Sequence, residues 1–189
     1  MPAAMSPSAL AVVGLGLAAC QTAAEARAVP IAVHGDGVDV ELTRVASGCE
    51  SDGAVIVVGG DVVSRGGWRL AAGPSGRELT DHGALVARIV DEPRRRSYLD
   101  ATGVPLGRVA LTADGGTISG PARDVIGTVT RDGDRLRWRD AAGRTRATIT
   151  GTDDLDVALA LIAPSTLPPA ARALVACARL SATSPSPAK

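Results

Sequence analysis

The sequence predicts a mainly β protein, a small antiparallel sheet or barrel of repeated hairpins, followed by a C-terminal pair of short helices. First, Gly- and Asp-rich turns interrupt β-rich runs at intervals of roughly 8–12 residues from 59 to 151. Second, a pattern recurs every twenty residues between 77 and 151. Third, both patterns stop after 151, where Ala- and Leu-rich segments bounded by proline follow. With no Phe, one Tyr and two Trp, the chain must build its core from Val, Leu, Ile and Ala.

Residues 1–19 are predicted to be a signal peptide. The apolar run over 9–19 is too short to span a bilayer, which takes about 20 residues, and it matches the apolar region of a secretory signal. The run ends in "LAAC" (17–20), which resembles the lipobox of bacterial lipoproteins. The resemblance implies cleavage before Cys20, a lipid on the Cys20 thiol and, because Gln21 is not Asp, sorting to the outer membrane. No Lys or Arg precedes the run, and the alternative is a buried N-terminal helix with Cys20 as a small apolar residue.

The segment 20–29 is predicted to be a short tether, and residues 30–151 the β-rich repeat domain. Residues 30–45 predict a hairpin, because apolar and polar residues alternate from Val38 to Thr43 and glycines stand in the turn at 34–37. The run "AVIVV" (54–58) is apolar at every position, which is typical of a strand covered on both faces.

The twenty-residue pattern aligns three bulky residues, Tyr98, Ile118 and Trp138. It also aligns three small residues, Gly107, Gly127 and Ala147, each followed two positions later by a β-branched residue. Gly103 and Gly143 coincide, with Arg123 breaking the pattern between them, and a weaker copy begins at Gly83. One unit holds two short strands and two turns, and such hairpins need neighbours to bury their apolar edges. The small residues predict a close approach of strands or units.

The segment "RWRDAAGRTRATIT" (137–150) resembles the YD (RHS-type) repeat, in which an aromatic, an Asp and a Gly-Arg pair punctuate β-units of this length. The spacing is also similar to that of small bacterial β-flower domains. The resemblance covers about residues 77–151, implies an architecture of stacked hairpins, and brings no catalytic residue with it.

Two helices are predicted over 150–164 and 165–180, the helical pair occupying 152–180. Thr152 or Asp153 is the expected cap of the first helix, and Ser165 or Thr166 that of the second. In the second helix, Leu167, Ala171, Leu174 and Ala178 form the apolar face, and Arg172 and Arg179 are expected to point away from it. The pair is expected to cover a sheet face or a barrel mouth. Residues 181–189 are predicted to be a disordered tail.

Two cysteines remain after Cys20, namely Cys49 and Cys177. An export signal implies an oxidising compartment, in which an even pair of cysteines favours a disulfide, and Cys177 is expected to face inward toward Cys49. The alternative is two buried free thiols. Neither cysteine has a second metal ligand nearby, so no metal site or other cofactor is predicted.

Other polar residues receive mainly structural interpretations. His34 and His82 are interpreted as solvated turn residues rather than metal ligands or bases. The aspartates of the repeat are interpreted as turn formers rather than calcium ligands, and these are Asp100, Asp114, Asp134 and Asp140. The charged segment 91–97 is interpreted as a solvated connecting loop.

Tyr98 and Trp138, equivalent in the repeat, are either a ligand-stacking platform for a sugar or the bulky filler of an aromatic-poor core.

The sequence predicts no set of catalytic residues, since no nucleophile elbow or phosphate-binding loop is present. A formal charge of zero and the scarcity of aromatics argue against a nucleic-acid partner. The predicted function is therefore an exported, lipid-anchored envelope protein with a non-catalytic binding or structural role and an envelope protein or glycan as its partner. The alternatives are an envelope hydrolase or carbohydrate-processing protein, and an inhibitor-type module with a protruding loop at 71–79. The oligomeric state is not predicted.

Overall fold

The computed structural model describes residues 29–35, 38–59 and 62–182. The predicted signal peptide, Cys20, nearly all of the tether, residues 36–37 of the first turn and residues 183–189 lie outside this range. Fourteen strands precede two helices in the described residues. The strands are β1 (Ile31–Gly35), β2 (Val38–Val45), β3 (Gly48–Ser51), β4 (Ala54–Gly59), β5 (Val62–Arg65), β6 (Trp68–Gly73), β7 (Gly76–Asp81), β8 (Ala84–Glu92), β9 (Arg95–Asp100), β10 (Pro105–Leu111), β11 (Gly115–Ser119), β12 (Val125–Asp132), β13 (Arg135–Asp140) and β14 (Thr145–Thr150). The helices are α1 (Leu155–Ile162) and α2 (Pro169–Ala182).

The strands form a closed antiparallel barrel, as the sequence predicted. Each strand pairs with the next along the chain, and β1 closes the ring by pairing with β14, with Ala32 opposite Thr150. The hairpin predicted over 30–45 is confirmed, because β1 and β2 pair in register up to Gly35 and Val38. Closure leaves the wall without a free edge strand.

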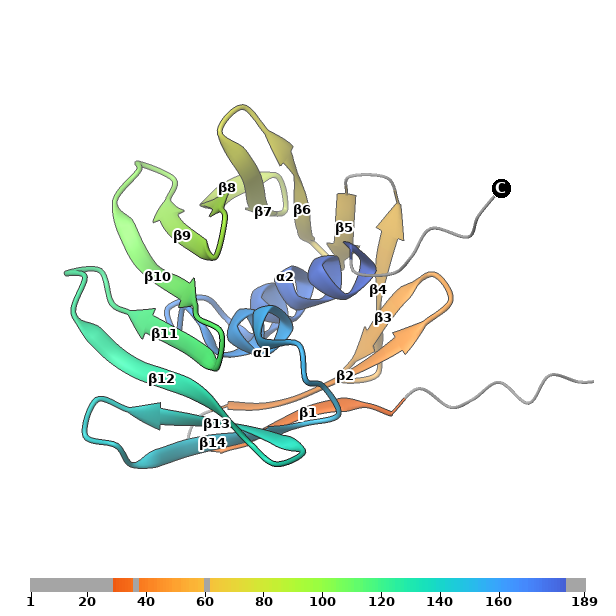
Figure 1. Cartoon of the computed structure of the whole chain (residues 1–189). Coiled ribbons are helices and arrows are strands. Elements are labelled where there is room, and N and C mark those ends of the chain that lie inside the picture. The colour runs from red at the N-terminus through yellow and green to blue at the C-terminus, as the bar shows by residue number, and fades with distance from the viewer. Residues whose placement is uncertain (1–28, 36–37, 60–61, 183–189) are drawn as a thin grey trace, which may run out of the picture.

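Both helices lie at the centre of the ring of strands (Figure 1). Every residue of α1 except Asp156 is buried, as expected for a helix surrounded by protein. Helix α2 packs against β2–β6, and α1 packs against β10 and β11. The contact is close at Gly116, where an added Cβ would lie 2.5 Å from a methyl carbon of Leu159. The helices therefore fill the interior of the barrel, whereas the sequence predicted that they would cover a face or a mouth.

The twenty-residue pattern corresponds to three successive hairpins, β9–β10, β11–β12 and β13–β14. In each, the bulky residue pairs with the small residue nine positions later. The pairs are Tyr98 with Gly107, Ile118 with Gly127, and Trp138 with Ala147. At Gly127 an added Cβ would lie 2.5 Å from both the Trp138 Nε1 and the carbonyl oxygen of Arg139. The predicted close approach is confirmed at this position, where the missing side chain leaves room for a bulky neighbour.

A β-bulge also recurs every twenty residues. The register between strands shifts by one residue immediately before Ala87, Gly107, Gly127 and Ala147. The extra residues are Val86, Leu106, Ile126 and Arg146. Bulges bend a strand and increase its twist, which helps a sheet curve into a barrel. Each twenty-residue repeat thus contributes one bulge, and with it part of the curvature that closes the barrel.

The geometry of the turns explains why Asp and Gly also recur at fixed positions of the repeat. The Asp100 carboxylate accepts hydrogen bonds from the backbone N–H groups of Thr102 and Val104, both at 2.8 Å. Asp140 does the same in its own turn, so the turn-forming interpretation is confirmed for these two aspartates. Hydrogen bonds from Thr102 and Val104 lower the pKa of Asp100. Arg123 stands where the neighbouring units have glycine and adopts the same left-handed backbone, with φ of 67°.

A disulfide joins the wall to the interior. Cys49 of β3 and Cys177 of α2 are both fully buried, and their sulfur atoms are bonded. The cysteines are 128 residues apart in the sequence. The predicted pairing, with Cys177 facing inward, is present in the structure.

Three details of the predicted elements are wrong. Strand β4 is covered on one face only, because Val55 and Val57 are each 50% exposed on the outside of the barrel. Asp154 rather than Thr152 or Asp153 caps α1, accepting hydrogen bonds from the backbone of Asp156 and Val157.

Helix α2 begins at Pro169 and continues to Ala182, two residues into the predicted tail. Pro169 occupies the first helical position, where its missing N–H costs no helical hydrogen bond.

Candidate functional site

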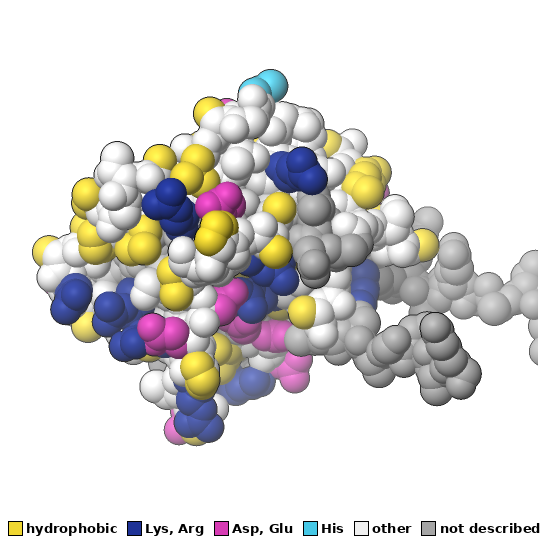
Figure 2. All heavy atoms as spheres, turned by 90° about the horizontal axis from the view of Figure 1, so that it is seen from above, with side chains coloured by type: hydrophobic (Ala, Val, Ile, Leu, Met, Phe, Trp, Pro, Cys, Tyr) yellow, Lys and Arg dark blue, Asp and Glu magenta, His cyan; other side chains and the backbone are white. Residues whose placement is uncertain are grey.

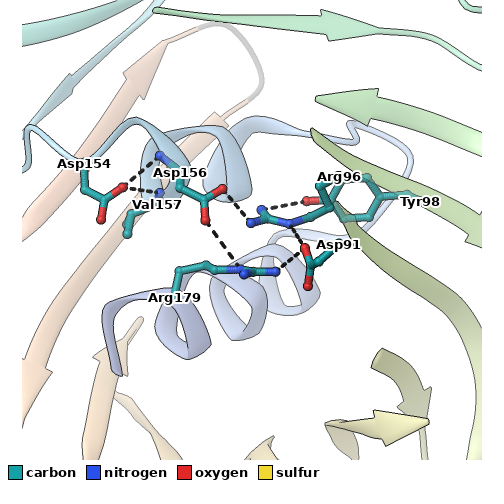
Figure 3. Close-up of polar contacts among 7 residues, drawn as sticks. All are labelled: Asp91, Arg96, Tyr98, Asp154, Asp156, Val157 and Arg179. Atoms are coloured by element: carbon teal, nitrogen blue, oxygen red, sulfur yellow. Dashed lines mark hydrogen bonds and ion pairs between the residues drawn. The ribbon is translucent and has the colours of Figure 1, made fainter. Parts of the chain in front are cut away.

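Four charged side chains form a closed ring of ion pairs between the wall and both helices (Figure 3). Arg96 of β9 donates to Asp91 of β8 at 2.9 Å and to Asp156 of α1 at 2.5 Å. Arg179 of α2 is paired with Asp91 and lies 3.7 Å from Asp156. Positive and negative groups alternate around this ring, which we call the charged ring. The interpretation of 91–97 as a solvated connecting loop therefore holds for the exposed β8–β9 turn but is wrong at Arg96, which is buried, and the expected outward orientation of Arg179 is wrong.

Backbone register places two members of the charged ring side by side. Asp91 and Arg96 are directly opposite each other in the β8–β9 hairpin. Arg96 also shares the inward face of β9 with Tyr98, whose hydroxyl accepts a hydrogen bond of 3.4 Å from the Arg96 guanidinium. That alternation was the signal available in the sequence, because a strand that buries Tyr98 must also turn Arg96 inward.

The remaining acid is fixed by a helix cap. Asp156 stands in the first turn of α1, and Asp154 accepts a hydrogen bond of 2.9 Å from its backbone N–H. A carboxylate in the first turn is also favoured by the helix dipole. Nothing in the sequence pairs Asp156 with residue 96, because the contact depends on how α1 enters the barrel.

The electrostatics of the charged ring favour the ionised forms of two of its members, Asp91 and Arg96. Burial alone would raise the pKa of Asp91, but hydrogen bonds and charges from Arg179 and Arg96 outweigh it and lower the pKa. Burial would likewise lower the pKa of Arg96, yet Tyr98, Asp156 and Asp91 together raise it. The Tyr98 hydroxyl has a raised pKa, chiefly through burial. Asp91 and Arg96 therefore keep their charges at neutral pH, the Tyr98 hydroxyl stays neutral, and the ion pairs of the charged ring join the wall to both helices.

A second buried arginine holds the helices to each other. Arg172 of α2 is 4% exposed and donates to the carbonyl oxygens of Leu161 and Ile162 at 3.1 and 3.0 Å. These carbonyls belong to the last turn of α1, which carries the negative end of the helix dipole. Burial lowers the pKa of Arg172. The expectation that Arg172 points away is wrong, because a helix inside a barrel has no solvent-facing side at this position.

The residues proposed for ligand stacking do not form one platform. Tyr98 is fully buried, which leaves neither face of its ring for a ligand, and it fills the core. Trp138 lies on β13, four strands from β9 in the barrel, and is half-buried against the same core.

Both histidines are exposed and paired with a carboxylate. His34 lies 2.8 Å from Asp39, and His82 lies 2.8 Å from Asp81. Among the described residues, no group of three or more His, Cys, Asp or Glu is arranged to hold a metal ion.

The outer wall of the barrel carries mixed charge and a groove. Figure 2 shows basic side chains interspersed with acidic ones over one face of the molecule. The outer groove, with a volume of about 500 Å³, lies over β5–β7. Its lining includes Ser64, Trp68, Arg69, Glu78 and Thr80.

The segment 71–79, predicted as a protruding loop, is largely a tight hairpin in which Gly73 pairs with Gly76.

Comparison with protein-family models, with curated proteins and with solved structures finds no match for this chain. In the part of the chain that the structure describes, no helix is both long enough and apolar enough to cross a membrane.

Proposed function

We propose that this chain is an exported, lipid-anchored protein of the cell envelope with a non-catalytic binding or structural role. The observation that carries the proposal is the buried disulfide between Cys49 and Cys177. Disulfides persist in oxidising compartments and are rare in the cytosol. The lipobox-like segment at 17–20 points independently to export and to an anchor at Cys20.

The fold supports a role for the outer wall in binding. In the described residues, α1 and α2 occupy the interior of the barrel and share one hydrophobic core with the inward residues of the strands, which leaves the outer wall as the surface for a partner. The resemblance to YD and β-flower repeats supports the same proposal, because in such repeats successive hairpins build an extended surface. Partners would then meet the outward residues of the strands and the turns between them.

Intact-mass spectrometry of the membrane fraction tests the anchor. We expect the mature chain to begin at Cys20, to carry the mass of a diacylglycerol and an acyl chain, and to lack two hydrogens for the disulfide. A Cys20→Ser variant should stay unprocessed and unlipidated. A wild-type chain that stays soluble, with an unmodified Cys20, would rule the anchor out.

A glycan is the second candidate partner, and the outer groove favours it. Trp68, which is partly buried and packs against the core, is among the residues that line this groove, together with Glu78 and Thr80. Aromatic rings paired with hydrogen-bonding groups suit sugar rings, which have both apolar faces and hydroxyls.

Tryptophan fluorescence tests glycan binding, because the chain has only two tryptophans. Envelope oligosaccharides should shift the emission of wild type and of Trp138→Phe, and leave Trp68→Phe unchanged. Equal shifts in both variants, or no shift in wild type, would refute the outer groove as a glycan site.

A further inference from the structure

A second, smaller pocket lies where the repeat departs from its own pattern. It has a volume of about 110 Å³ and is bounded by β9, β10 and the turn between β11 and β12. Leu99, Pro105 and Pro121 give it apolar walls, and two arginines, Arg108 and Arg123, are also among its lining residues. We call it the arginine pocket.

Arg123 occupies a backbone position that favours glycine. Its φ is 67°, and the equivalent residues of the neighbouring units are Gly103, with φ of 93°, and Gly143, with φ of 78°. A residue with a Cβ is strained in this conformation, whereas glycine is not. The turn itself is therefore served better by glycine, and the reason for arginine must lie in its side chain.

Arg108 carries a buried donor without an acceptor. Its Nε is inaccessible to solvent and makes no hydrogen bond among the described residues. The equivalent residues of the next two units are Thr128 and Thr148, which carry no charge. Buried polar groups in folded proteins are nearly always satisfied, so an unsatisfied charged donor beside a pocket indicates an absent acceptor.

Within the described residues, no acidic side chain pairs with the guanidinium group of Arg108 or Arg123. No hydrogen bond or ion pair joins the side chain of Arg108 or Arg123 to another described residue. Asp124 is on the same turn, beside Gly120, and its carboxylate lowers the positive potential of the pocket without pairing with either arginine.

The geometry points to the arginine pocket as a binding site for a carboxylate group carried on a short apolar chain. The fork of a guanidinium matches a carboxylate, and two such groups fix its orientation. The apolar walls of Leu99 and the prolines suit an alkyl portion rather than a fully hydrated ion such as phosphate. Either a free short-chain acid or the C-terminal carboxylate of a peptide offers this chemistry. The inference supplies a ligand class for the binding role proposed above and rests on that role, but not on the lipid anchor.

Isothermal titration calorimetry of the purified full chain distinguishes a free short-chain acid from a peptide C-terminus as the ligand. The probes are butanoate, a trialanine peptide with a free carboxylate, the same peptide amidated, and inorganic phosphate. We expect saturable binding of butanoate or of the free-acid peptide, and none of the amidated peptide. Phosphate binding as tight as that of either carboxylate would overturn the preference for an apolar chain.

Four variants test the residues. Arg123→Gly restores the glycine of the neighbouring units and Arg108→Thr the threonine of the next two units, so both variants are expected to fold, and each should weaken binding roughly tenfold or more. Arg94→Gly is the matched control, because Arg94 is also left-handed, with φ of 61°, but lies in the β8–β9 turn outside the arginine pocket. Asp124→Asn should tighten binding, a change that mere loss of structure would not produce.

Each outcome bears on one proposal only. Saturable binding that survives Arg123→Gly, or is lost equally in Arg94→Gly, would refute the arginine pocket, as would the absence of carboxylate binding to wild type. A chain that carries lipid on Cys20 and binds no carboxylate leaves the envelope proposal standing. A chain that binds carboxylate but carries no lipid on Cys20 supports the arginine pocket and refutes the lipid anchor.

Discussion

Replacing Cys49 and Cys177 together by alanine is expected to cost about 5 kcal/mol in the free energy of unfolding. The disulfide closes a loop set by a sequence separation of 128 residues. In the chain-entropy model a loop of this size is worth about 5 kcal/mol at 25 °C, because the cross-link restricts the unfolded chain. Small domains have total stabilities of about 5–15 kcal/mol, so the loss is a large share of the whole. It corresponds to a fall in Tm of roughly 10–20 °C for a chain of this size.

Urea unfolding followed by circular dichroism measures this loss. The control is the wild-type chain in reductant, which keeps both sulfur atoms and loses only the cross-link. Variant and reduced wild type should lose similar amounts, with a further loss in the variant from the atoms removed at two fully buried positions. A loss below about 1 kcal/mol in both samples would show that the unfolded chain is already compact, and the entropic reasoning would fail.

Three further perturbations follow from the same structure. Arg96→Met should cost about 1–3 kcal/mol in urea unfolding because it removes the buried guanidinium that hydrogen-bonds to the partly exposed carboxylates of Asp91 and Asp156, whereas Arg135→Met, at an exposed ion pair, should cost about 0–1 kcal/mol. Gly127→Ala should cost about 1–3 kcal/mol through overpacking against the next strand, and Gly59→Ala, with open space around it, should change Tm little. The pKa of Asp91 is lowered in the folded state, so its stabilisation is present above the unfolded pKa of about 3.9 and is lost as pH falls through the folded pKa. Asp91→Asn should therefore flatten the acid limb of stability against pH, and an unchanged limb would contradict the assigned pairing.

The sequence predicted the strands of the barrel wall better than it predicted the contacts of the helices and charged residues inside the barrel. The spacing of Tyr98, Ile118 and Trp138 was sufficient to find the hairpins, because side-chain size must match across neighbouring strands at every copy. The same alignment misread Arg123 as a break. The backbone of Arg123 is left-handed like that of Gly103 and Gly143, so the turn is kept and only the side chain differs.

The incorrect predictions share one cause, which is that a residue pattern along the chain does not show which other elements pack around a strand or helix. Val55 and Val57 lie on the open face of β4 although the run is apolar throughout. Arg172 and Arg179 were assigned to a solvated side of a helix that has almost none. Arg96, Asp156 and the charged ring depend on contacts between segments 60 residues apart, which no local period records.

The order of elements along the chain has a consequence for biogenesis. Translation delivers the fourteen strands first and the two helices last, yet the apolar lining of the strands has no partner until the helices arrive. A nascent chain therefore cannot complete its core before the helices have been synthesised. A product truncated before Leu155 would leave the apolar residues of the strands without their helical partners, which favours capture by chaperones and proteases.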